Sequence, residues 1–183
     1  MVYRLATEKL NLMSIEPFIR IAREAPQVRM LIVGEGPLLA PFVARARDAG
    51  VRAQFHFAGR ARYADLPNLY DRMDLFLAPL HEESYGVVVP YALSKGIPVL
   101  AYPVGALPEI LDDDRCFCAD AEVMAERALA LIRSPERARE LGQALSARRA
   151  GFSLEPMMDA YRTLYASLPP GSVDPRPPRL AGP

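Results

Sequence analysis

Residues 79–99 read PLHEESYGVVVPYALSKGIPV, and this stretch decides the fold. An acidic loop that includes Glu83 leads to a turn at Gly86, after which we expect a short helix over Val87–Lys95 and a buried strand from Ile97. A loop and helix that join two strands in this way are typical of a parallel sheet, and the helix start leaves free backbone N–H groups beside a crevice. The stretch therefore predicts an α/β fold with a ligand crevice near Glu83.

The same alternation of short apolar runs and longer amphipathic runs continues on both sides of this stretch. Repeated strand–helix units predict a Rossmann-like parallel sheet with helices on both faces. After Asp120 the periodicity predicts helices only, and the last of them covers about Glu155–Leu168. The expected strands are Val2–Leu5, Arg29–Val33, Gln54–Ala58, Leu75–Ala78, Pro98–Tyr102 and Arg115–Cys118.

The chain is long enough for one ordinary domain, which we assign to residues 1–168. Residues 169–183 hold six prolines and show no apolar periodicity, so we expect a disordered tail there. A doubly wound domain seldom begins with its central strand at residue 1, and the chain is therefore expected to be half of a larger protein.

Composition narrows the classes of function. Lys+Arg and Asp+Glu are 22 each, so the overall charge gives no reason to expect nucleic acid as a partner. No apolar run has the length of a membrane span, and the charged N-terminus is no signal peptide, so the cytoplasm is the expected compartment. Cys116 and Cys118 match neither a C-x-x-C redox pair nor a four-ligand zinc set, and we expect two ordinary buried or half-buried thiols.

Two cations near the N-terminus are candidates for an anion site. Arg4 ends the first expected strand, and Lys9 follows five positions later, before a helix. At the carboxyl end of a parallel strand both side chains can face the crevice where open α/β sheets bind ligands. An Arg fork and a Lys point charge suit a diphosphate. The alternative is a pair of solvated surface cations.

Two glycine turns follow other expected strands. Gly34 and Gly36 permit a tight turn and a close approach of the backbone to a ligand, but Leu39 stands at the third glycine position of a dinucleotide fingerprint. Gly86 precedes a helix start that suits phosphate, and Glu83 could accept hydrogen bonds from sugar hydroxyls. Plain strand-to-helix turns and a solvated loop acid are the alternatives.

These pieces become specific when they are taken in order along the chain. Arg4 and Lys9 are followed by GEGP, FAG, DLPNLY, DLFLAP, EESYG, ALSKGIPVLAY and PVGALPEIL. This order and spacing resemble the C-terminal, donor-binding half of family 4 glycosyltransferases, which have the GT-B fold. The resemblance covers about residues 2–168.

The resemblance implies a site for a nucleotide-diphosphate sugar. It implies that Arg4 and Lys9 hold the donor diphosphate and that Glu83 contacts the donor sugar, and we predict these three as the catalytic residues. Enzymes of this family need no catalytic metal, and we expect neither a metal nor a cofactor. The residues predicted to bind the donor are Gly34, Gly36, Arg60, Ser84, Tyr85, Gly86, Val87 and Tyr91.

The chain also departs from the family pattern. The motif has a second glutamate eight positions after Glu83, where it binds the ribose hydroxyls, and this position is Tyr91. Tyr3 stands where glycine is usual, and we expect it to crowd the phosphate pocket. The resemblance does not include the family's N-terminal acceptor-binding domain. We expect the acceptor site, and any peripheral contact with a membrane, to come from such a domain or from a partner chain.

The expected function is therefore that of the donor-binding half of a retaining glycosyltransferase, with a carbohydrate, lipid or small-molecule acceptor. One rival is a degenerate binding or structural domain, which Tyr91 and Tyr3 favour. The other is an unrelated doubly wound enzyme, such as an epimerase or a flavodoxin-like protein. The lack of a dinucleotide fingerprint or a proton-transfer pair argues against this second rival.

Overall fold

The computed structural model of the chain describes residues 1–148 and 154–168. The chain divides into two compact units, Met1–Arg149 and Ala150–Pro183, and each is described by itself. The expected tail at 169–183 lies outside the described residues. Within the described ranges, no helix is long and apolar enough to cross a membrane.

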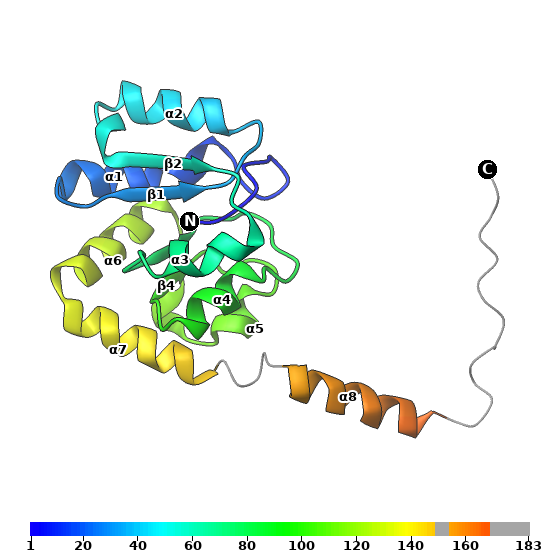
Figure 1. Cartoon of the computed structure of the whole chain (residues 1–183). Helices are drawn as coiled ribbons and strands as arrows, with labels where there is room; N and C mark the ends of the chain where they lie inside the picture. The colour runs from blue at the N-terminus through cyan, green and yellow to red at the C-terminus, as the bar shows by residue number, and fades with distance from the viewer. Residues whose placement is uncertain (149–153, 169–183) are drawn as a thin grey trace, which may run out of the picture. The chain divides into compact units, whose positions relative to one another are not determined.

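The first unit is built on parallel strands, as the strand–helix alternation predicts (Figure 1). Strand β1 (Met30–Val33) pairs with β2 (Phe55–Gly59), and β3 (Phe76–Ala78) pairs with β4 (Val99–Ala101), both in parallel. The side chains of β3 and β4 are all buried, because helices cover strands of this kind on both sides. All four strands lie within two residues of their expected positions.

Two expected strands do not form. Residues Val2–Leu5 make a single parallel bridge, between Val2 and Val33, although the Tyr3 N–H donates to the Val33 carbonyl oxygen at 3.0 Å. Near the other edge a short 3₁₀ helix, Asp114–Cys116, replaces the first half of the strand expected at Arg115–Cys118, because the Asp113 side chain accepts a hydrogen bond from the Arg115 N–H and caps the turn. The second half is reduced to a single parallel bridge, between Phe117 and Ala101. The described strands therefore form two separate pairs.

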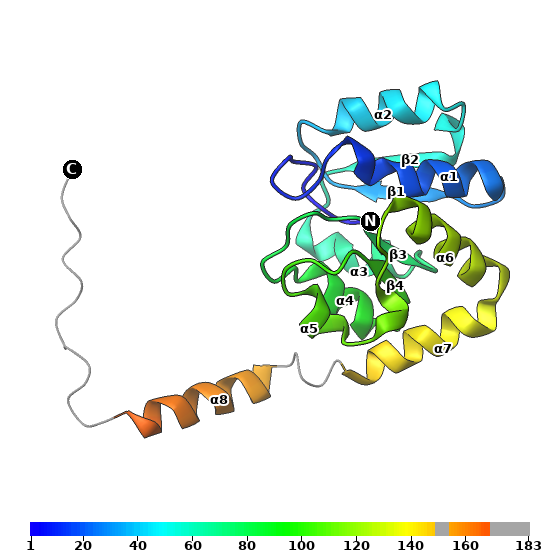
Figure 2. The ribbon, with the colours of Figure 1, turned by 180° about the vertical axis from the view of Figure 1, so that it is seen from behind.

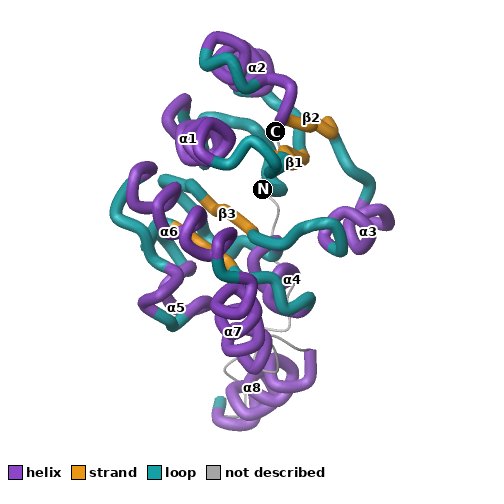
Figure 3. The backbone as a smooth tube through the Cα atoms, turned by 90° about the vertical axis from the view of Figure 1, so that its left-hand side faces the viewer, coloured by secondary structure: helices purple, strands orange, loops and turns teal. Residues whose placement is uncertain are grey.

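Helices lie on both sides of the strands, as Figure 3 shows for α1 and α6 on one side and α3 on the other. Helix α1 packs on α6, a contact that is seen from behind in Figure 2 and that joins the two halves of the unit. Proline occupies the first turn of α1, α3, α5 and α7, where its missing N–H costs little. The helices are α1 (Glu16–Glu24), α2 (Leu39–Asp48), α3 (Leu66–Tyr70), α4 (Val88–Ser94), α5 (Leu107–Leu111), α6 (Ala121–Arg133) and α7 (Pro135–Ser146).

Cys116 and Cys118 are free and buried, as expected for ordinary core thiols. Burial is the main cause that raises the pKa of Cys116 to about 12 and that of Cys118 to about 11. Both side chains therefore stay protonated at neutral pH, and they behave as small apolar groups.

The second unit contains one described helix, α8 (Leu154–Ser167), one residue ahead of its expected bounds. None of its side chains is buried, and the rings of Tyr161 and Tyr165 stack with centroids 6.1 Å apart. The apolar periodicity of this segment predicts the helix correctly.

Candidate donor site at the carboxyl ends of the strands

Two loops, residues 5–14 and 79–86, are joined at the carboxyl end of β3. The His81 N–H donates to the Lys9 carbonyl oxygen at 3.1 Å, and the His81 ring lies 3.2 Å from the Thr7 carbonyl oxygen. Ser14 is buried, and its hydroxyl donates to the Pro79 carbonyl oxygen at 2.8 Å. These contacts between residues more than 60 positions apart fix the two loops side by side.

Lys9 and Glu83 meet where these loops touch. Lys9 Nζ lies 2.5 Å from Glu83 Oε1, which also accepts a hydrogen bond from the Ser84 N–H at 3.0 Å. The Glu83 side chain is 1% exposed and that of Lys9 is 33% exposed. The carboxylate is therefore an interior group, while the ammonium, which has three N–H donors, keeps an open side. The sequence predicts both residues for one site, and the structure brings them together.

Two glycines make room for Glu83. A Cβ on Gly86 would stand 2.8 Å from the Glu83 carboxylate, and one on Gly105 would stand 1.6 Å from the Glu83 carbonyl oxygen. Both glycines have positive φ, 68° and 54°, a region that side chains disfavour. The burial of Glu83 thus depends on a second loop, between β4 and α5. The sequence motifs do not reveal that this loop contacts Glu83.

Arg4 and Tyr3 point to opposite environments, although they are neighbours. Arg4 is 70% exposed and forms an ion pair of 3.7 Å with Glu8. The Tyr3 side chain is buried, with its ring edge-on to Phe76 of β3 at a centroid distance of 6.0 Å. Burial and then the Glu83 carboxylate hold the pKa of Tyr3 well above its usual value. Tyr3 therefore lies in the interior, with Glu83 among its charged neighbours, and its effect on a phosphate pocket stays a prediction.

Gly34, Gly36 and Arg60 lie on the same edge, after β1 and β2. A Cβ on Gly34 would meet the Tyr3 carbonyl oxygen, and one on Gly36 would meet the Leu5 carbonyl oxygen. These glycines let the loop after β1 lie close against the first residues of the chain. Arg60 is exposed, and its N–H donates to Glu35 Oε1 at 3.3 Å.

The remaining predicted donor residues surround the start of α4. Ser84, Tyr85 and Val87 are exposed. Tyr91 is half-buried, and its ring lies 4.7 Å from that of Tyr70, whose hydroxyl donates to the Val88 carbonyl oxygen at 3.0 Å. Tyr91 therefore packs as an aromatic residue at the motif's second glutamate position, and Tyr70 is a neighbour that the sequence pattern does not identify.

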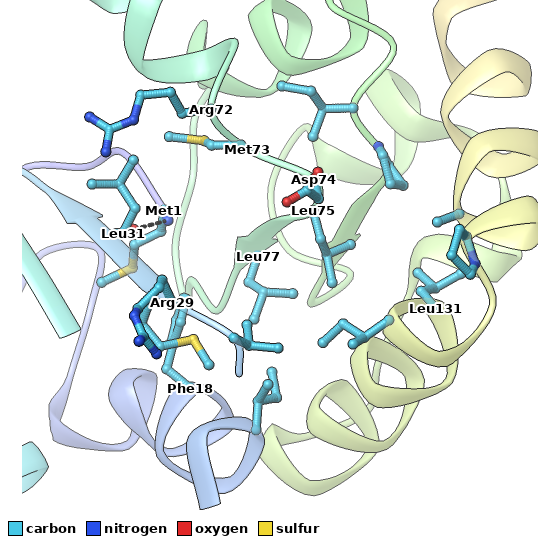
Figure 4. Close-up of a pocket in the computed structure, with 18 of the residues that line it drawn as sticks. Met1, Phe18, Arg29, Leu31, Arg72, Met73, Asp74, Leu75, Leu77 and Leu131 are labelled. Atoms are coloured by element: carbon cyan, nitrogen blue, oxygen red, sulfur yellow. Dashed lines mark hydrogen bonds between the residues drawn. The ribbon is translucent and has the colours of Figure 1, made fainter. Parts of the chain in front are cut away.

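A cavity of about 720 Å³ lies at the opposite, amino ends of β1, β3 and β4 (Figure 4). Apolar side chains such as Phe18 and Leu77 line it, together with Arg29, Arg72 and Asp74. It has a different set of lining residues from the predicted site. In open α/β sheets the carboxyl ends are the ligand-binding side, so we place the candidate site there and not in this cavity.

The acidic run Asp112–Asp114 forms ion pairs with nearby arginines. Asp112 pairs with Arg148, and Asp113 pairs with Arg115 at 2.7 Å, a hydrogen-bonded contact that lowers the pKa of Asp113. Within residues 1–148 and 154–168, no group of three His, Cys, Asp or Glu side chains is placed to hold a metal ion.

Comparisons with known proteins find related sequences over most of the chain. The family model described as "Glycosyl transferases group 1" matches residues 1–148. The chain is 34% identical over 164 residues to a D-inositol 3-phosphate glycosyltransferase of Segniliparus rotundus, and 25% identical over 156 residues to an N-acetyl-alpha-D-glucosaminyl L-malate synthase of Bacillus anthracis. These matches cover 85% and 82% of this chain, but it spans only 36% and 40% of the two relatives.

Solved structures show the same fold. The catalytic domain of cholesterol-alpha-glucosyltransferase from Helicobacter pylori matches with a TM-score of 0.73 at 18% identity, over 84% of this chain and 96% of that one. HepE of Anabaena, solved with UDP and glucose, matches with a TM-score of 0.77 at 20% identity, over 91% of this chain and 47% of that one. The predicted α/β fold, one half of a GT-B arrangement, is thus confirmed.

Proposed function

The chain belongs to the glycosyl transferases group 1 family, and from this premise we propose that residues 1–148 bind the donor of a sugar-transfer reaction. The donor is a nucleotide-diphosphate sugar, and the acceptor is a carbohydrate, a lipid or a small molecule. The observation that carries the proposal is the contact between Lys9 and Glu83 at the carboxyl edge. It unites the family motif with a fixed cation at the ligand-binding side of the sheet.

The chemistry assigned to the cations follows from the leaving group. When the bond between the sugar and the diphosphate breaks, negative charge grows on the diphosphate oxygens. Arg4 offers a planar fork for these oxygens, and Lys9 offers the N–H donors that Glu83 leaves free. Groups held in place before the reaction stabilise such charge most effectively. In this proposal the two side chains take the part that a metal ion has in other enzymes, so the reaction requires neither a resident metal nor a cofactor.

Other parts of the proposal rest on the family resemblance. Retention of configuration at the transferred sugar is expected. The acceptor site belongs to an N-terminal domain or a partner chain, because a closed cleft between two halves is needed to position the acceptor and exclude water. We assign the activity to the cytoplasm, with any membrane contact made peripherally through the acceptor-binding half.

The experiment that tests this function is a calorimetric titration of the chain with UDP, GDP and ADP. At least one nucleotide is expected to bind, and Arg4→Ala or Lys9→Ala is expected to weaken its binding tenfold or more, equivalent to about 1.4 kcal/mol. Lys95→Ala is the matched control, because Lys95 also forms a close ion pair, 2.6 Å from Asp71, but lines the cavity at the amino ends. If no nucleotide binds at millimolar concentration, the proposal is wrong.

A further inference from the structure

Two buried side-chain polar atoms have no hydrogen-bond partner within residues 1–148 and 154–168: the Tyr3 hydroxyl oxygen and Glu83 Oε2. Tyr3 and Glu83 are only 6% and 3% exposed. Buried polar groups are almost always paired, and an unpaired one is costly enough to need an explanation. In this chain the two exceptions belong to one neighbourhood, the interior beneath the candidate donor site.

The two groups are complementary. Tyr3 precedes the loop that carries Lys9. Its ring packs edge-on against Phe76 of β3, the strand that leads to Glu83. Burial, and after it the charge of Glu83, raise the pKa of Tyr3 further above neutrality, so the Tyr3 hydroxyl keeps its proton and is a donor at neutral pH. A carboxylate oxygen is an acceptor. One group therefore has the proton that the other could accept, yet they are not hydrogen-bonded in this structure.

The ion pair with Lys9 explains why the bond is not needed here. Glu83 Oε1 accepts from Lys9 Nζ at 2.5 Å and from the Ser84 N–H at 3.0 Å. The proposed function directs the same ammonium at a diphosphate. When Lys9 turns toward that anion, a carboxylate that is 1% exposed loses its close cation, and a buried charge without a partner is strongly destabilising.

We propose that Tyr3 is a positioning residue that replaces Lys9 as the side-chain hydrogen-bond partner of Glu83 when Lys9 binds the donor. The Tyr3 hydroxyl then donates to Glu83 Oε2, directly or through one buried water, and keeps the carboxylate charged and in place. Gly86 leaves the space beside Oε2 that this exchange needs, since a Cβ there would stand 2.8 Å from that oxygen. The inference rests on the proposed function, and it gives a role to the tyrosine that replaces the family's glycine.

The first test needs no nucleotide. In the otherwise unchanged chain, Tyr3→Phe removes a hydroxyl without a partner, so the melting temperature should stay the same or rise. In a Lys9→Met background the hydroxyl becomes the remaining side-chain partner of Glu83. Tyr3→Phe should then lower the melting temperature by on the order of 5 °C, as expected for the loss of a hydrogen bond to a charged group. Equal effects in the two backgrounds would overturn the proposal.

Tyr70→Phe is the matched control for this cycle. Tyr70 belongs to the same aromatic cluster, stacked on Phe76 at 5.8 Å, but its hydroxyl donates to the Val88 carbonyl oxygen whatever Lys9 does. Loss of the Tyr70 hydroxyl should lower the melting temperature by the same amount with and without Lys9→Met. If Lys9→Met does not fold, Glu83→Gln replaces it. The neutral amide then removes the charge, and adding Tyr3→Phe should not weaken UDP binding further.

The second test measures UDP affinity. Tyr3→Phe should weaken UDP binding about 10- to 100-fold, although it does not destabilise the free chain. If the hydroxyl only stabilised the fold, its removal would not weaken UDP binding while leaving the free chain as stable as before. If UDP binds the unmodified chain and Tyr3→Phe leaves its affinity unchanged, the inference is wrong. If UDP does not bind, GDP or ADP takes its place in this test; if none of the three binds, the proposed function fails, and the stability cycle alone decides the role of Tyr3.

Discussion

Gly105→Ala is the substitution whose effect follows most directly from the geometry. Gly105 has φ of 54°, and a Cβ at this position would stand 1.6 Å from the Glu83 carbonyl oxygen and 2.7 Å from its carbon. These are backbone atoms, so no rotamer change relieves the overlap. Gly96 is the control, because it has φ of 68° but nothing within 4 Å of an added Cβ. The pair separates the cost of backbone conformation from that of displacing Glu83.

The two costs can be estimated separately. A left-handed backbone costs a non-glycine residue about 1–2 kcal/mol, and this applies to both variants. Forcing an extra methyl group into a packed region adds about 1–3 kcal/mol, and this applies to Gly105→Ala alone. For a chain of this length, 1 kcal/mol corresponds to about 2–4 °C in melting temperature. We expect a loss of roughly 4 °C for Gly96→Ala and roughly 10 °C for Gly105→Ala.

The assay is thermal unfolding followed by circular dichroism, together with UDP titration below the transition. Because Gly105→Ala moves the backbone of Glu83 and with it the anchor of Lys9, UDP affinity should fall tenfold or more, whereas Gly96→Ala should leave it unchanged. Equal melting temperatures for the two variants, or full UDP affinity in Gly105→Ala, would refute the argument that this glycine sets the position of Glu83.

Three further predictions concern the ion pair, the motif and the thiols. Lys9→Met should lower the free energy of unfolding, measured by denaturant titration, by about 2 kcal/mol; this is below the range for fully buried pairs because Lys9 is partly exposed. Adding Glu83→Gln should restore most of this loss, and equal stability of the single and double variants would contradict the role of the pair. Tyr91→Glu should tighten UDP binding about tenfold in calorimetry, because a carboxylate at this position can bind the ribose hydroxyls, and unchanged affinity would place the ribose elsewhere. The same substitution removes the ring contact with Tyr70 and should lower the free energy of unfolding by about 1 kcal/mol. The raised pKa values of Cys116 and Cys118 mean that the unfolded chain loses these protons first, so the free energy of unfolding should fall as pH rises above 9, by about 1.4 kcal/mol per thiol at pH 10. Alanine at both positions should flatten that slope, and a slope that is unchanged in the alanine variant would show that other groups cause it.

The sequence predicts the elements whose information is local. The four paired strands, helix α4 and the helices α6 to α8 follow from the apolar pattern of the sequence. The strand expected at Val2–Leu5 is reduced to one bridge because pairing depends on the neighbouring strand: β1 ends at Val33, and the Leu5 N–H donates to Glu35 beyond that end. The strand expected at Arg115–Cys118 is wrong in its first half, because the Asp113 cap favours a 3₁₀ turn there, while Phe117 still makes a parallel bridge to Ala101.

The site shows the same division between local and tertiary information. Motif order places Lys9 near Glu83, and the structure agrees. The burial of Glu83 could not be predicted, since HEESYG has the composition of a solvated loop and the backbone that encloses Glu83 comes from Gly105, more than twenty residues later. The inward direction of Tyr3 is likewise set by Phe76. The one available signal was a tyrosine at a position where the family has glycine.

The most direct test of the central claim is to locate the nucleotide by NMR titration of the isotope-labelled chain with UDP. A donor site at the carboxyl ends predicts amide shift changes concentrated in residues 4–9 and 83–88, with the region around Arg72 and Leu131 at the opposite cavity unaffected. Shift changes confined to that cavity, or no changes with UDP, GDP or ADP at millimolar concentration, would contradict the account.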